Sequence, residues 1–145
     1  MKSQIQRQLA LIPFLFGLLL AACMSTAVLA QTQIGADIDG EAALDKFGYS
    51  VSLSADGNRL AIGALRNDGN GEDSGQVRVF QWNGLSWLQL GADIDGEAAG
   101  DRSGSPVSLS SDGERLAIGA GYNDGNGVDS GHVRVYRWTD SEWSQ

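Results

Sequence analysis

Cysteine, histidine and proline are all scarce in this chain of 145 residues, which contains one, one and two of them respectively. A single cysteine excludes an intramolecular disulfide, so the fold must be stabilised by packing and sheet pairing. The sequence also lacks a nucleophile elbow, a phosphate-binding loop and the spacing of zinc ligands. With His132 as the only histidine, these absences predict a protein that is not an enzyme.

Positive charge is in short supply as well, because 10 lysines and arginines are set against 18 aspartates and glutamates, for a net charge of −8. Nucleic acids and anionic membrane surfaces select proteins with clustered lysine and arginine. The charge balance therefore argues against both as partners. It favours cations, or neutral ligands such as glycans.

One long apolar run is present, over residues 9–22, and it follows two basic residues near the start of the chain. Small residues at positions 28–30 then offer a cleavage site after Ala30. This arrangement predicts a signal peptide over residues 1–30 and a secreted, extracellular protein. A membrane-spanning helix is not expected, because the run has about 14 residues where roughly 20 are needed.

A second processing signal overlaps the first. Residues 20–23 read LAAC, which resembles the bacterial lipobox, in which the cysteine becomes the lipid-bearing N-terminus. The alternative to secretion is therefore a lipid anchor on Cys23 at the bacterial cell envelope. The sequence leaves both processing sites, Ala30 and Cys23, open.

The rest of the chain is one 56-residue unit written twice. Residues 33–88 and 89–144 align without insertion or deletion, and 37 of the 56 positions are identical. A repeat of this fidelity is a piece of supersecondary structure that needs neighbours to cover its apolar faces. We therefore take residues 33–88 and 89–144 as two repeats of one modest domain, since the chain after residue 30 is too short for two independent domains.

Each unit alternates apolar and polar residues with a period of two, interrupted by Gly, Asn and Asp, which predicts an all-β structure. In the first unit we expect four antiparallel strands, at residues 49–54, 59–64, 76–82 and 87–90. A turn at Asp56 and Gly57 joins the first two strands, with Gly57 at positive φ, and Asp112 and Gly113 repeat it.

The connection between the last two strands changes its sequence between the units and keeps its length. We therefore expect a four-residue loop rather than a two-residue turn that requires Asn-Gly. This choice places Trp82 opposite Trp87 and Trp138 opposite Trp143.

Four antiparallel strands in about 50 residues are typical of a β-propeller blade. Large apolar residues lie on one face of the inner strands and Ser, Ala and Gly on the other, so successive blades can stack. We predict two propeller-like blades, ahead of a β-sandwich or a solenoid. Two blades fill only part of a ring and leave apolar faces uncovered, so we expect a homo-oligomer, for example of three or four chains, or a longer propeller.

Several short motifs follow one another in the first unit, and they are FG at 47–48, VSL at 51–53, DG at 56–57, LAIGA at 60–64 and VRVF at 77–80. This series resembles the FG-GAP repeat, which is found in the propellers of integrin α-subunits and in many secreted bacterial proteins. The resemblance covers both units. It implies a propeller blade in an extracellular setting of recognition or adhesion, without implying catalysis.

Two departures limit what the resemblance implies. Ser103 stands where the first unit has Phe47, so the second unit loses its FG pair. The family's calcium loop lies between the first two strands, but here those turns read SADGNR and SSDGER, with an Arg in place of the last acid. Such turns cannot supply the six or more oxygens that calcium needs.

Acidic residues gather elsewhere in each unit. The loop after the second strand and the link to the next blade leave a blade at the same rim, so we expect that rim to be acidic. It would collect thirteen of the 18 acidic residues, namely Asp37, Asp39, Glu41, Asp45, Asp68, Glu72, Asp73, Asp93, Asp95, Glu97, Asp101, Asp124 and Asp129.

Six residues of this rim have the spacing of ligands for a hard cation such as calcium, and they are Asp68, Asn70, Asp73, Asp124, Asn126 and Asp129. The same residue types also stabilise turns through their own backbone. Both interpretations, a metal site and turn chemistry, stay open.

The four tryptophans, Trp82, Trp87, Trp138 and Trp143, also have two interpretations. They cover the outer strands and seal adjacent blades, or they form an aromatic platform for a sugar ring. We predict a secreted, non-catalytic module that recognises or adheres to an extracellular protein or glycan. The alternatives are a lectin-like glycan binder, with or without a cation, and a structural fragment of a longer repeat protein.

Overall fold

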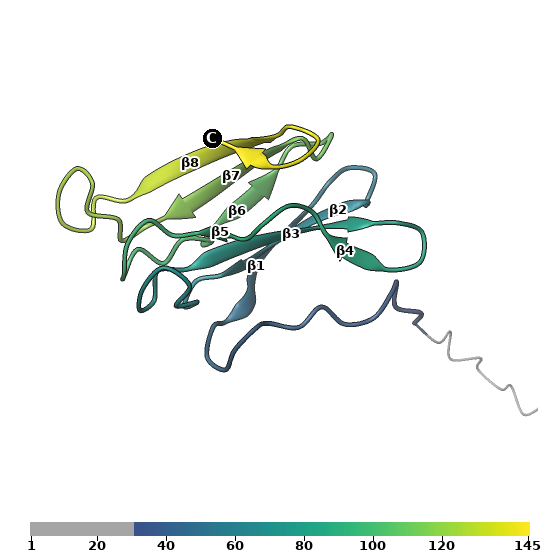
Figure 1. The fold of residues 1–145 in the computed structure, drawn as a ribbon, viewed down its shortest axis with the longest axis horizontal. Coiled ribbons are helices and arrows are strands. Elements are labelled where there is room, and N and C mark those ends of the chain that lie inside the picture. Colours follow the sequence, from purple (N-terminus) through teal and green to yellow (C-terminus); the bar gives the residue numbers. More distant parts are fainter. Residues whose placement is uncertain (1–30) are drawn as a thin grey trace, which may run out of the picture. The chain divides into compact units, whose positions relative to one another are not determined.

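The computed structural model describes residues 31–145. The predicted signal peptide, its cleavage site and Cys23 lie outside these described residues. Within the described part of the chain, no helix is long and apolar enough to cross a membrane. The secondary structure there consists of strands and turns (Figure 1), which confirms the predicted all-β class.

The strands form two antiparallel sheets. The first contains β1 (Phe47–Leu53), β2 (Arg59–Ala64), β3 (Gln76–Trp82) and β4 (Trp87–Gln89) in sequential order, with β5 (Ile94–Asp95) paired to β3. The second contains β6 (Val107–Leu109), β7 (Arg115–Ala120), β8 (His132–Trp138) and β9 (Trp143–Ser144) in the same order. Each sheet is a meander of the kind that forms a propeller blade, and the two sheets do not close into a ring.

The predicted turns are present in both sheets. Gly57 and Gly113 have φ of 74° and 70°, values that glycine adopts without strain. Trp82 pairs with Trp87 and Trp138 with Trp143 in the strand register. The four-residue loops between these pairs confirm the choice of loop length.

The segment after β4 differs from the expected rim link. The Leu90 N–H donates to the Val79 carbonyl at 2.7 Å, and Ile94 pairs with Val77. The chain from β4 to β5 therefore runs beside β3 as one interrupted edge strand. Asp93 consequently lies along the edge of the sheet, and not at its rim as predicted. In that position its carboxylate accepts a hydrogen bond from the Gln89 side chain. The interruption removes the alternation that would have predicted this strand.

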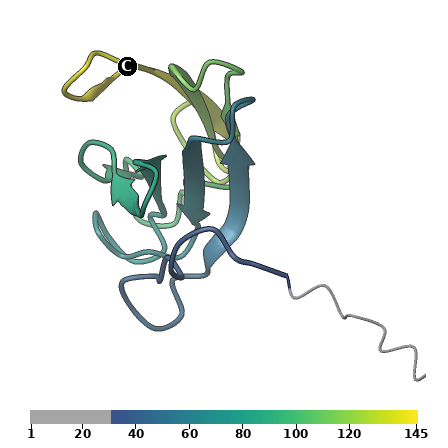
Figure 2. The same ribbon diagram turned by 90° about the vertical axis from the view of Figure 1, so that its right-hand side faces the viewer.

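The second sheet, drawn green to yellow, lies next to the first, drawn blue to teal, in both views (Figures 1 and 2). Their shared buried core contains Ala61, Val77 and Val79 from the first sheet, Ile94 from β5, and Val107, Leu116, Ile118 and Tyr136 from the second. The two sheets approach each other closely at Gly63, which faces the backbone of Gly104. A Cβ at position 63 would lie 2.0 Å from the Gly104 carbonyl oxygen, so only glycine fits there.

Candidate functional site

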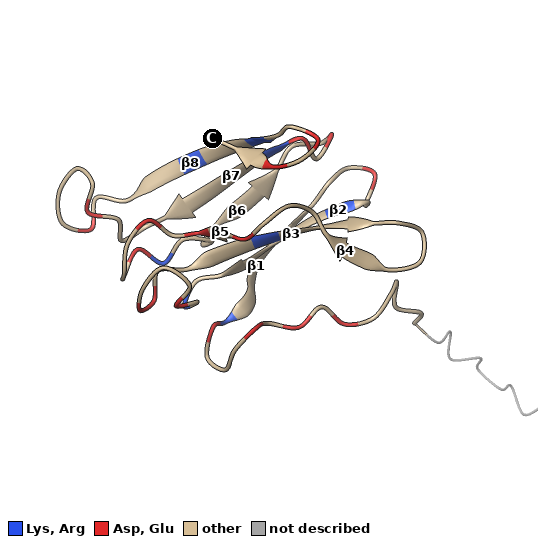
Figure 3. Cartoon of the chain, viewed as in Figure 1, with Lys and Arg blue, Asp and Glu red and all other residues tan. Residues whose placement is uncertain are grey.

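One end of the two sheets carries the loops 65–75 and 121–131, and we call it the loop end. The second half of the link between the sheets reaches the same place, because the Gly100 N–H donates to the Glu72 carbonyl at 2.8 Å and the Arg102 N–H donates to the Asp73 carbonyl at 3.1 Å. Acidic positions lie mostly in loops and links rather than inside strands (Figure 3). The loop end is thus an acidic surface on a β scaffold.

Two buried aspartates hold the loop end together. Asp45 Oδ2 accepts hydrogen bonds from the Asn67 side-chain amide at 3.0 Å and from the Ala42 N–H at 3.2 Å. Asp101 Oδ2 accepts from the Asn123 amide at 2.9 Å in the second unit. Buried carboxylates are tolerated where such bonds replace water. Asn67 and Asn123 were not predicted as site residues, although the presence of asparagine at this position in both units was a usable signal.

The first set of predicted cation ligands makes turn and inter-sheet contacts. Asp68 Oδ1 accepts from the Asp73 N–H at 2.8 Å, which closes the loop on itself. The Asn70 amide donates to the Gly96 carbonyl at 2.9 Å, across to the link. The Asp73 carboxylate lies 3.6 Å from the Arg102 guanidinium. Each side chain therefore has a role in the fold.

The second set repeats the loop without the inter-sheet contacts. Asp124 Oδ1 accepts from the Asp129 N–H at 2.8 Å, and the Asn126 N–H donates to Ser130 Oγ at 3.3 Å. Among residues 31–145, no group of three His, Cys, Asp or Glu side chains is placed to hold a metal ion. Calcium binding at these loops stays a prediction.

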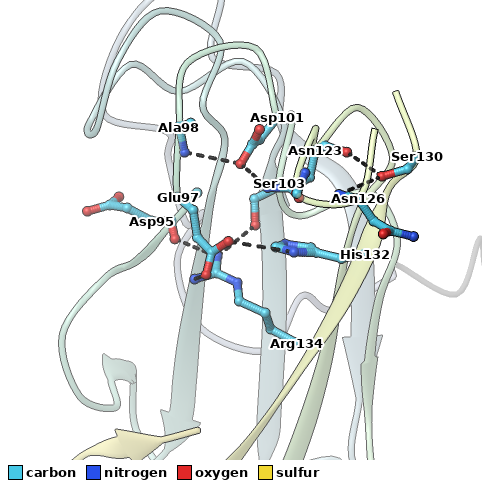
Figure 4. Close-up of polar contacts among 12 residues, drawn as sticks. Asp95, Glu97, Ala98, Asp101, Ser103, Asn123, Asn126, Ser130, His132 and Arg134 are labelled. Atoms are coloured by element: carbon cyan, nitrogen blue, oxygen red, sulfur yellow. Dashed lines mark hydrogen bonds and ion pairs between the residues drawn. The ribbon is translucent and has the colours of Figure 1, made fainter. Parts of the chain in front are cut away.

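Two buried arginines, Arg78 and Arg134, were not singled out from the sequence. Arg134 Nη2 donates to the Asp95 carbonyl at 2.6 Å, and Arg78 makes the equivalent bond at 2.7 Å in the first unit. Glu97 lies 3.9 Å from the Arg134 guanidinium and 3.6 Å from His132 Nδ1 (Figure 4). Each arginine thus fastens the link to the third strand of its own unit.

The lost FG pair has a structural replacement. In the first unit the Arg78 guanidinium lies 4.2 Å from the centroid of the Phe47 ring, a cation–π contact. In the second unit the buried Ser103 accepts a hydrogen bond from Arg134 at 3.4 Å instead. Tyr136 lies next to this arginine, and burial raises the pKa of its hydroxyl.

The tryptophan pairs pack on the start of each link. Their ring centroids are 5.4 Å apart in both units, at tilted angles. The Trp87 indole N–H donates to the Ile34 carbonyl at 3.1 Å, and that of Trp143 donates to the Leu90 carbonyl at 2.9 Å. The pairs therefore clamp the links, and the sugar platform stays a prediction.

The opposite end of the sheets carries the hairpin turns. The pKa of Asp56 is lowered to about 2, first because Ser54 Oγ donates to its carboxylate and then because the Asn58 N–H does so. The pKa of Asp112 is lowered for the same reason, with Ser110 as the donor. These aspartates serve the turns, as the sequence predicted.

Comparison with known proteins fits this geometry. Residues 33–80 match the sequence model of the FG-GAP repeat. No curated protein sequence matches the chain. The matched segment contains β1, β2 and most of β3, the three strands that define the blade-like sheet. Residues 33–80 therefore belong to the FG-GAP repeat family.

Proposed function

We propose that this protein is an extracellular, non-catalytic module for recognition or adhesion, and that its ligand surface is the loop end. The observation that carries the proposal is the exposure of Asp68, Glu72 and Asp124 on loops that are otherwise fixed by hydrogen bonds. Binding residues commonly sit on loops that a rigid scaffold holds in place. The FG-GAP repeat supports a propeller-type module as that scaffold.

The charge of the loop end defines the kind of partner. Exposed carboxylates attract cationic groups and steer their approach. The net charge of −8 disfavours nucleic acid and anionic lipid. The ligand is therefore an extracellular protein with a basic patch, or a glycan.

Charge-neutralising variants test the proposal. The variant D68N/E72Q/D124N removes three charges from the loop end and keeps hydrogen-bond acceptors in place. The control variant D112N/D140N/E142Q removes three charges from the opposite end. On arrays of extracellular matrix proteins, we expect the first variant to lose about tenfold in affinity, or about 1.4 kcal/mol, while the control binds normally. Equal binding by both variants would contradict the proposal.

A lectin-like mode is the second candidate, because Trp82 and Trp87 are only half-buried and offer ring surface to a sugar. A glycan array in calcium and in chelator separates it from protein recognition. A cation at loops 65–75 and 121–131 also predicts that millimolar calcium raises the melting temperature, by binding the folded state alone.

The calcium effect should disappear in D68N/D124N and should not be reproduced by magnesium. Equal melting temperatures in calcium and chelator would reduce both loops to turn chemistry. Absence of binding to every matrix protein and glycan would favour the third interpretation, a structural segment of a longer repeat protein.

A further inference from the structure

The face of the first sheet that packs against the second unit has an uncovered equivalent. Val77 and Val79 of β3 are 0% and 1% exposed beneath the second sheet. Val133 and Val135, which occupy the same positions in β8, are 66% and 54% exposed. We call the face with Val133, Val135 and Ala117 the outer face of the second sheet.

The matching half of the interface is also exposed in the chain. Val107 of β6 is 7% exposed, because it enters the core between the sheets. Its equivalent in β1, Val51, is 61% exposed, and Leu53 beside it is 55% exposed. The chain thus exposes one half of this contact at Val133 and Val135, and part of the other half at Val51 and Leu53. Ile62 and Phe80, the equivalents of the core residues Ile118 and Tyr136, are only 5% and 6% exposed.

We propose that the outer face of the second sheet binds the β1 face of a second copy of this chain, head to tail. The contact repeats the one between the two units of a single chain. It joins two different faces, so copies assemble into a ring if the rotation closes and into a filament if it does not. This inference rests on the repeat geometry and does not depend on the ligand proposed above.

The start of the first unit is already shaped for this contact. Between the units, Ile94 and Asp95 form β5, which pairs with Val77 and Gln76 of β3. Residues 38 and 39 are their equivalents. Arg78 holds the Asp39 carbonyl in the first unit just as Arg134 holds that of Asp95. Residues 38 and 39 are therefore preorganised to pair with β8 of a second copy.

Polar contacts across the internal interface also have equivalents. Inside the chain, the Asp73 carboxylate lies 3.6 Å from the Arg102 guanidinium. In the contact between copies, Asp129 takes the place of Asp73, and Lys46 of the second copy takes the place of Arg102. Lys46 has the same left-handed backbone as Arg102, with φ of 59° against 53°. An opposite-charge pair is thus retained between copies.

The side-chain donors Asn70 and Gln76, which bond across the internal interface, also have equivalents on the outer face. The Asn70 amide donates to carbonyls of the link, and its equivalent Asn126 is exposed at the edge of the outer face. Gln76 donates to Asp95 at 3.4 Å, and His132 occupies its place. His132 would then lie next to Asp39 of the second copy, so a donor at this position keeps a carboxylate partner.

In this contact, a groove in the outer face would receive the turn of the second copy. It has a volume of about 320 Å³ and is lined by Arg115, Val135 and Arg137, among others. In the first unit the equivalent arginine, Arg59, donates to the Gly113 carbonyl of the neighbouring turn at 2.9 Å. The turn that would enter the groove carries Asp56, whose charge complements the two arginines.

The contact between copies changes some internal hydrogen bonds. Ser50 Oγ accepts from the Val107 N–H at 3.0 Å, and Pro106 replaces that serine in the second unit. Inside the chain, Glu114 forms an ion pair with Arg59. In the contact between copies, the neutral Asn58 takes the place of Glu114, so this ion pair is lost. The apolar centre and the backbone pairing remain, so these differences weaken the contact without removing its basis.

Sedimentation of paired variants tests the proposal. The chain is expressed with its N-terminal segment and purified as the cell processes it. Val135→Glu places a charge in the centre of the outer face. Val128→Glu is the matched control, because Val128 is exposed in the loop and the first unit has Glu72 at that position.

We expect a mass of several chains for the unsubstituted protein and for Val128→Glu at micromolar concentration, and the mass of one chain for Val135→Glu. Circular dichroism verifies that both variants keep their β structure. A single-chain mass for the unsubstituted protein over the whole concentration range would overturn the proposal. An unchanged assembly in Val135→Glu would also overturn it.

Cross-linking tests the direction of the contact in a Cys23→Ser background. Three samples are oxidised: the variant Lys46→Cys alone, the variant Asp129→Cys alone, and a mixture of the two. The control D73C/R102C should close a disulfide inside one chain, because the Arg102 N–H already bonds to the Asp73 carbonyl. We expect disulfide-linked dimers in the mixture alone. Dimers of Asp129→Cys alone would show face-to-face pairing and contradict the head-to-tail contact.

Discussion

The two units share most of their sequence and differ in their surroundings. The β3 face of the first unit is buried under the second sheet, whereas the β8 face of the second unit is open. The strand order, the turns and the tryptophan pairs are nevertheless the same in both, although β6 has three residues where β1 has seven. The repeat therefore specifies its own sheet, while the neighbouring unit decides which side chains of that sheet are buried.

The largest effect should come from breaking the close approach that distinguishes the covered face. Gly63→Ala introduces a Cβ 2.0 Å from the Gly104 carbonyl, which is backbone and cannot move aside. We expect a loss of about 3 kcal/mol in unfolding free energy, measured by urea denaturation. Gly121→Ala is the control, since nothing lies within 4 Å of a Cβ there. Equal losses in both variants would show that the sheets do not meet at Gly63.

A smaller effect should follow from trimming equivalent valines on the two faces. Val79→Ala leaves a cavity in the core and should cost about 2 kcal/mol. Val135→Ala should change stability by less than about 0.5 kcal/mol in dilute protein, where the outer face is solvated. Rising protein concentration should enlarge the effect of Val135→Ala alone. Identical effects at every concentration would remove the distinction between the faces.

A third comparison concerns the clamps on the links. Trp87→Phe and Trp143→Phe each remove one indole hydrogen bond, worth about 1 kcal/mol. Leu90, held by Trp143, has a second bond to Val79, whereas Ile34 is held by Trp87 and lies before the first sheet. We therefore expect hydrogen exchange of residues 33–39 to accelerate in Trp87→Phe. No change there would show that the indole does not hold the segment.

The smallest effect is a pH dependence that both units should share. The pKa of Asp56 is about 2 in the folded state, below its ordinary value of 3.8. Its stabilisation is therefore complete above about pH 5 and is lost as the pH falls through 4 toward 2. The gap in melting temperature between the protein and Asp56→Asn should narrow over that range.

Asp112→Asn should behave in the same direction, because the pKa of Asp112 is lowered by an equivalent serine. The turn bonds are local, so the surroundings of the unit should not matter. A gap that stays constant down to pH 2 would contradict the assignment of these carboxylates to the turns.

The sequence predicted the parts of the fold that depend on neighbouring residues. The Asp56–Gly57 turn, the four strands of a blade, the loop between Trp82 and Trp87 and the FG-GAP resemblance all follow from short-range patterns. Such patterns act through backbone preference and alternation of side chains, which a linear sequence displays directly.

Only the tertiary structure decided the contacts between distant segments. The Asn67–Asp45 bond, the Arg134 clamp on Asp95 and the edge strand β5 each join residues that the sequence separates by 17 or more positions. Burial was settled in the same way, because Val77 and Val133 stand at the same position of the nearly identical segments SGQVRV and SGHVRV, yet only Val77 is buried. What covers a sheet face is a property of packing, which no local pattern encodes.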